Sequence, residues 1–89
     1  MKNLSEYKVG EDVDVNMQIG NNREWRKGIV VDSREIHPEW GVKHRPYTML
    51  IVECIRTYFN AETQEYYDKL NREGFVYADQ VRSHYTQPK

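Results

Sequence analysis

The chain has few of the residues that would commit it to a specialised class of protein. Its 89 residues include one cysteine, three prolines and five glycines. The single cysteine, Cys54, excludes an internal disulfide framework and any zinc site built from several cysteines. No apolar run is long enough to cross a membrane and no signal peptide is readable, so we expect an intracellular protein without a membrane partner. It would be nuclear in a eukaryote and cytoplasmic otherwise.

Catalytic motifs are also missing. The sequence contains no glycine-rich phosphate loop, no His-x-x-x-His or Cys-x-x-Cys spacing, and no readable pair of nucleophile and base. Its three histidines are scattered at positions 37, 44 and 84. Cys54 lies in an apolar run, which is typical of an inert core thiol. We therefore expect a protein that is not an enzyme and that holds no metal ion or cofactor.

The residues that are present favour one small folded domain. Apolar residues make up 38% of the chain, charged residues 30% and aromatic residues 12%. This content of aromatic residues argues against disorder, and the length of the chain allows one small hydrophobic core. The net charge of −1 excludes a nucleic-acid polycation, although residues 23–45 carry six Lys or Arg against four acids. We expect a monomer with a domain over residues 9–85 and flexible ends at 1–8 and 86–89.

The longest apolar run, Tyr-Thr-Met-Leu-Ile-Val-Glu-Cys-Ile-Arg at residues 47–56, predicts the strand around which the others are arranged. The run is rich in β-branched residues, contains no glycine and follows Pro46 directly. Because apolar residues occur on both faces of this run, we expect a strand that is buried on both sides.

Two strands are predicted before this run. An alternation of apolar and polar residues indicates a first strand with one solvated face, and the turn residues 20–22 follow it. A second strand is expected from about residue 24 to 36, where Gly28 marks a bulge or a close backbone approach. The apolar positions of the first strand are Val13, Val15, Met17 and Ile19.

Two short strands are predicted after the run, at residues 75–77 and 81–85, with a tight turn between them. The segment 60–72 is ambiguous, since its aromatic and leucine residues have helical spacing, which favours a short helix, whereas a hairpin extension is the alternative. Across all strands we expect a core that contains Val13, Val15, Ile29, Val31, Leu50, Val52, Val76 and Val81.

Five short strands with these turns predict an all-β fold, a small five-stranded SH3-like barrel, because closing a bent meander removes its exposed edges. Three stretches carry a resemblance to a family. They read Val-Gly-Glu-Asp-Val-Asp-Val (9–15), Trp-Arg-Lys-Gly-Ile-Val-Val (25–31) and Phe-Val-Tyr-Ala-Asp-Gln-Val-Arg (75–82). The chain thereby resembles the Tudor, Agenet and chromo-barrel domains. It departs from them where Met17 and Gln18 replace an aromatic residue and Phe75 replaces a tryptophan.

This resemblance implies a non-enzymatic, chromatin-type reader of a protein or peptide partner. Such domains hold methylated Lys or Arg in an aromatic cage by cation–π attraction. Carried over by position, the cage residues would be Trp25, Tyr58, Phe59 and Tyr77, with Glu53 selecting lower methylation states. Trp40, in the long loop 37–46, is expected either to cover the core or to present its ring to a ligand.

Two alternatives stay open at this point. A mildly basic face could bind RNA or DNA, with tryptophans that stack on bases. A plain protein–protein interaction or regulatory domain would share the fold and need no cage. The basic residues of the nucleic-acid alternative are Arg23, Arg26, Lys27, Lys43 and Arg45.

Overall fold

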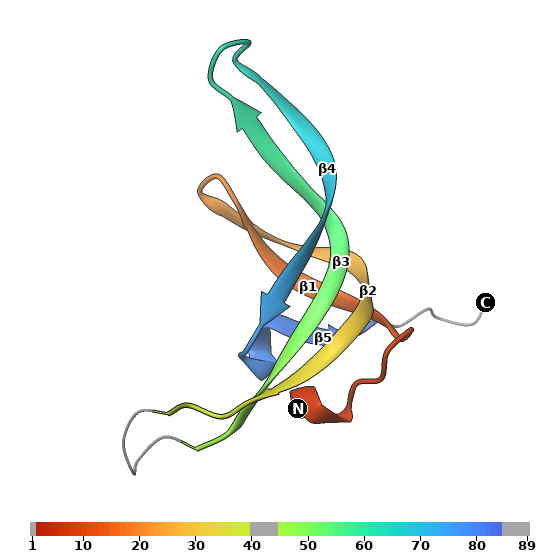
Figure 1. Cartoon of the computed structure of the whole chain (residues 1–89). Helices are drawn as coiled ribbons and strands as arrows, with labels where there is room; N and C mark the ends of the chain where they lie inside the picture. Colours follow the sequence, from red (N-terminus) through yellow and green to blue (C-terminus); the bar gives the residue numbers. More distant parts are fainter. Residues whose placement is uncertain (1, 40–44, 85–89) are drawn as a thin grey trace, which may run out of the picture.

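The computed structural model describes residues 2–39 and 45–84 of the chain as a strongly bent antiparallel sheet (Figure 1). The strand order β4-β3-β2-β1-β5 confirms the all-β prediction, but the sheet is not closed. The elements are η1 (Leu4–Glu6), β1 (Asp12–Ile19), β2 (Asn22–Ile36), β3 (Tyr47–Asn60), β4 (Glu65–Phe75), η2 (Ala78–Gln80) and β5 (Val81–Ser83), where η marks a 3-10 turn.

The bend of the sheet comes from β2, which pairs with β1 along its first half and with β3 along its second half. The pairing of β2 with β3 shifts by one residue between Val30 and Asp32, so one residue of β2 bulges out of the ladder. Gly28 pairs with both Val13 and Cys54, and its missing side chain lets the strands approach closely there. The sequence therefore indicated the close approach at the right residue, and the bulge lies just after it.

The core lies on the concave face of the bent sheet. Of the residues predicted to form it, Val13, Val15, Leu50, Val52 and Val81 are buried. The other buried apolar residues are Leu4, Tyr7, Met17, Val30, Cys54 and Phe75.

The prediction of the core is wrong for three residues. Ile29 is 46% exposed because Val13 pairs with Gly28, which turns Gly28 and Val30 inward and Ile29 outward. Val31 sits in the bulge and is half-buried. Val76 follows the end of β4 and is exposed, while Phe75 fills the core in its place. The predicted strand at 75–77 is thus the end of β4 and stops at Phe75.

The apolar run is part of β3, as predicted, but only one of its faces is buried. Leu50, Val52 and Cys54 point into the core, whereas Ile55 is 40% exposed on the opposite face. Burial raises the pKa of the Cys54 thiol to about 11, so this thiol stays protonated and inert near neutral pH.

The predicted helix in residues 60–72 is wrong, because β3 and β4 continue together as a long hairpin arm that projects from the sheet (Figure 1). We call the part that spans residues 57–70 the arm. Its turn forms at residues 61–64 because the Asn60 side-chain oxygen accepts hydrogen bonds from two backbone N–H groups, and Gln64 adopts a positive φ of 57°. Ring pairs across the hairpin, Tyr58 with Tyr67 and Phe59 with Tyr66, favour strands over a helix.

The N-terminal segment contributes to the core, which the sequence did not predict for residues 1–8. Leu4 and Tyr7 are buried, with exposed fractions of 6% and 4%. The Tyr7 hydroxyl donates a hydrogen bond to the carbonyl oxygen of Val81 at 3.3 Å, and burial raises the pKa of this hydroxyl. Lys2 lies over the Tyr7 ring and forms an ion pair with Glu11 at 3.0 Å.

Val52→Ala is expected to lower the free energy of unfolding by about 1–3 kcal/mol, because it removes two fully buried methyl groups and leaves a cavity beside Val30. The matched control is Ile55→Ala on the exposed face of the same strand, with an expected loss below about 1 kcal/mol. Chemical denaturation of both variants measures the difference. A larger loss for Ile55→Ala would mean that the inward face of β3 has been assigned wrongly.

Candidate functional site

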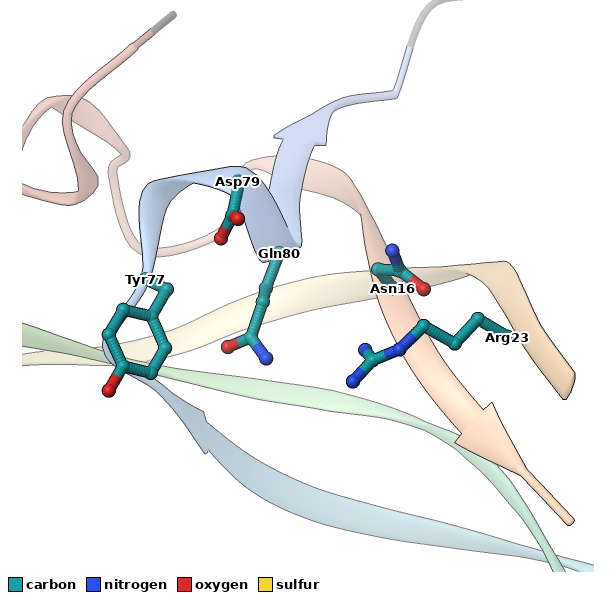
Figure 2. Close-up of a pocket in the computed structure, with 5 residues that line it drawn as sticks. All are labelled: Asn16, Arg23, Tyr77, Asp79 and Gln80. Carbon is teal, nitrogen blue, oxygen red and sulfur yellow. The ribbon is translucent and has the colours of Figure 1, made fainter. Parts of the chain in front are cut away.

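A polar pocket of about 410 Å³ lies between the β1–β2 hairpin and the short η2 segment (Figure 2). Asn16 of β1 and Arg23 of β2 form one side, and Tyr77, Asp79 and Gln80 form the other. The Gln80 carboxamide and the Arg23 guanidinium extend from opposite sides toward the space between them (Figure 2). The β1–β5 pairing holds these two sides together, since η2 leads directly into β5.

The side chains of this pocket have unused hydrogen-bonding capacity. Within residues 2–39 and 45–84, those of Arg23, Tyr77, Asp79 and Gln80 form no hydrogen bond or ion pair at all. The Asn16 side-chain oxygen is buried and has no partner there either. A buried polar atom without a partner is costly, which makes the Asn16 oxygen an exception among the described residues.

Two further hollows adjoin this pocket. Asn16, Arg23 and Gln80 also line a hollow of about 250 Å³ that reaches toward β4, where Arg56 is bound to Glu73 by two hydrogen bonds of 2.6 and 2.8 Å. On the other side, Tyr77 also lines an apolar hollow of about 330 Å³. Tyr47 and Val76 complete that hollow, and all three of its residues are exposed. The first pocket shares residues with each of the two hollows, and we call the three together the groove, which is polar in the middle and apolar at one end.

Of the residues expected to form an aromatic cage, Tyr77 lines this pocket, whereas Trp25, Tyr58 and Phe59 do not. The Arg82 guanidinium lies over the Trp25 ring, 3.9 Å from the ring centroid. Tyr58 and Phe59 pack against Tyr67 and Tyr66 in the arm. The structure therefore does not bring the predicted rings together.

The remaining predicted ligand residues also lie apart from the pocket. Glu53, expected to read the methylation state, forms an ion pair with Arg72 at 3.2 Å on the outer face. Trp40 falls outside the described residues, so its two expected roles stay predictions.

Of the basic residues predicted for nucleic-acid binding, Arg23 lines the pocket and the other described ones do not. Arg26 forms an ion pair with Glu24 at 3.1 Å and approaches Asp68 at 3.9 Å, while Arg23 lines the pocket. Lys27 and Arg45 are exposed at separate places on the chain, and Lys43 falls outside the described residues. The positive charge of Arg26 is thus largely balanced, which leaves Arg23 as the basic residue that a ligand in the groove would meet.

Sequence analysis assigns Tyr77 to the aromatic cage and Arg23 to the nucleic-acid alternative, and it misses the other three pocket residues. Asn16 looked like an ordinary solvated position of an alternating strand, and Asp79 and Gln80 looked like turn residues. No local pattern could have joined them, because they meet only through the pairing of β1 with β5. Groups of His, Cys, Asp or Glu suited to a metal ion are not found in the described part of the chain.

Comparison with known proteins gives no relative: no family model, no curated protein and no solved structure matches the chain. Among the described residues there is also no helix with the length and apolar character needed to cross a membrane.

Proposed function

We propose that the protein is a non-enzymatic binding module that recognises a peptide segment of a protein partner in the groove beside η2. The observation that carries this proposal is the set of unpartnered polar side chains around the pocket. The Asp79 carboxylate offers acceptors, the Arg23 guanidinium offers donors, and the Gln80 carboxamide offers both. A polypeptide offers N–H donors and C=O acceptors in alternation, which suits such a mixed lining.

The groove also favours particular side chains of the peptide. The free guanidinium of Arg23 suits a carboxylate, which it can bind with two parallel hydrogen bonds. The hollow formed by Tyr47, Val76 and Tyr77 suits an apolar side chain, because its lining is mostly apolar. We therefore expect a peptide in which an acidic residue and an apolar residue lie close together.

The bent five-stranded meander supports the proposal that the fold is an open variant of an SH3-like barrel. In this arrangement β1 lies between β2 and β5, which places the β1–β2 hairpin next to η2. Connections between strands are a frequent position for binding residues, because the sheet fixes their ends while their sequence is free to vary.

Arg23→Ala and Tyr77→Ala test the groove. Peptides selected from a random displayed library on the wild-type protein are expected to combine acidic and apolar residues. Arg23→Ala should weaken binding of such a peptide by about tenfold or more, because a charge-assisted hydrogen bond is lost. Tyr77→Ala should weaken binding through loss of the ring that both hollows share. Isothermal titration calorimetry measures both affinities.

The chain offers matched controls for both changes. Lys27→Ala removes an exposed positive charge from the same strand as Arg23, outside the groove. Tyr66→Ala removes a ring that is 66% exposed, against 65% for Tyr77, but lies in the arm. Equal losses for a pocket variant and its control would contradict the proposal. Binding of a single-stranded oligonucleotide that depends on Arg23 and falls steeply with salt would instead favour the nucleic-acid alternative.

A further inference from the structure

The outer edge of β4 is long and regular. β4 is the last strand in the order of the sheet and pairs, among the described strands, with β3 alone. Its pairing with β3 runs without a register shift from Asn60–Glu65 to Leu50–Phe75. Free edges of this kind are usually short, bulged, interrupted by proline or lined with charged side chains, because their N–H and C=O groups can pair with another strand. β4 has eleven residues, no bulge and no proline, so its five charged residues decide which strand can pair with it.

We propose that two copies of this chain pair edge to edge through β4, antiparallel and around a twofold axis that passes Leu70. Leu70 is the midpoint of β4 (Glu65–Phe75), so this register pairs every residue of the strand. A residue that precedes Leu70 by a given number of positions then faces the residue that follows Leu70 by the same number in the second copy. The sequence alone predicts a monomer, so the proposed dimer departs from that prediction.

The charges of β4 are self-complementary in this register. Asp68 faces Arg72 of the second copy, and the symmetry forms this pair twice. Lys69 faces Asn71, and no two like charges are directly opposed. Moving the axis by one residue toward the turn places Lys69 opposite Lys69, and moving it by two places Asp68 opposite Asp68. Both alternatives set like charges against each other, which destabilises a pair of strands.

The exposed apolar residues fit the same axis. Leu70 is 57% exposed and lies opposite Ile55, which is 40% exposed on the same outer face. At the axis, Leu70 and Ile55 of both copies would form a cluster of four aliphatic side chains that is shielded from water. Tyr66 would face Gly74 of the second copy and lie beside the Met49 and Ile51 side chains, which fill the space over this glycine.

Cysteine cross-linking tests the register. In the proposed dimer position 70 is the one position of β4 that faces itself, with Cα atoms about 4.5–5.5 Å apart, within the range of a disulfide. Leu70→Cys is expected to form a covalent dimer under mild oxidation, seen on a non-reducing gel. Lys69→Cys and Asn71→Cys, which face other residues, should cross-link far less. Cys54 is buried and does not interfere.

Sedimentation equilibrium over a wide concentration range tests the dimer itself. The wild-type protein should dimerise, and Leu70→Lys should raise the dissociation constant of the dimer at least about tenfold, because it sets two ammonium groups face to face at the axis. The thermal stability of this variant checks that the monomer stays folded. A wild-type protein that remains monomeric at all concentrations would overturn the proposal. The β4 edge would then be available for pairing with a strand of another protein. Cross-links at position 69 or 71 in preference to 70 would overturn the register.

Discussion

Replacing Leu4 and Tyr7 together with alanine is expected to unfold the protein at room temperature. The two side chains are almost fully buried in the core. Removing buried side chains of this size costs about 2–5 kcal/mol each, whereas a domain of this length has about 3–5 kcal/mol of total stability. Tyr7 also loses its hydrogen bond to Val81, which leaves the Val81 carbonyl oxygen without that partner. Far-ultraviolet circular dichroism and the loss of a cooperative thermal transition would report the result.

The control for this pair is Ser5→Ala with Lys8→Ala, two exposed positions of the same segment. Its free energy of unfolding should stay within about 0.5 kcal/mol of the wild type, as is usual for exposed positions. If the Leu4 and Tyr7 double variant melted like the wild type, the segment would be a flexible end, as the sequence predicts for residues 1–8, and the core would begin with β1.

Gly28→Ala is expected to lower the free energy of unfolding by about 3 kcal/mol, the upper end for overpacking. A Cβ atom at this position would lie 2.5 Å from the Val52 Cγ1 and 3.0 Å from the Glu53 carbonyl oxygen. Neither atom can move freely, because Val52 is a stiff β-branched residue in the core and the carbonyl belongs to the backbone of β3. Chemical denaturation measures the loss.

Gly74→Ala is the matched control, a glycine in the neighbouring part of the sheet. Its new Cβ would meet the Met49 Sδ at 3.0 Å, and the flexible methionine side chain can move aside. We expect a change within about 1 kcal/mol, of either sign. Adding Val52→Ala to Gly28→Ala should cost less than the sum of the two single losses, since the first colliding atom is then gone. Additive losses, or equal losses at both glycines, would contradict the close approach of β2 and β3 at Gly28.

The sequence predicts β1 well, because apolar and polar residues alternate along this strand with a period of two. Val13, Val15 and Met17 alternate with polar residues because β1 buries one face, and that pattern needs no knowledge of distant residues. The core face of β2 could not be predicted in the same way. Ile29, Val30 and Val31 are all apolar, so the sequence allows either alternation, and it is the pairing of Gly28 with Val13 that turns Val30 inward.

The arm shows a different limit of sequence analysis. Residues 61–70 are all exposed, so neither face of this hairpin is selected for apolar residues and no strand period is visible. Tyr66, Tyr67 and Leu70 therefore showed a spacing that also suits a helix. What decides the structure is pairing with residues 55–60 of β3, which a local pattern does not contain. The pocket is hidden from the sequence for the same reason, since Arg23 and Gln80 are distant along the chain.

The short β5 strand has a consequence for the order in which the protein folds. Three consecutive hairpin pairings, from β1 to β4, join neighbours in sequence, whereas β5 must return from residues 81–83 to residues 13–15 of β1. Closing so long a segment costs more chain entropy than closing a hairpin, and only three residue pairs offset it. The four-strand meander should therefore assemble first and β5 should join last. The groove beside η2 would then exist only after this final step, so a partner that binds there would recognise the fully folded chain.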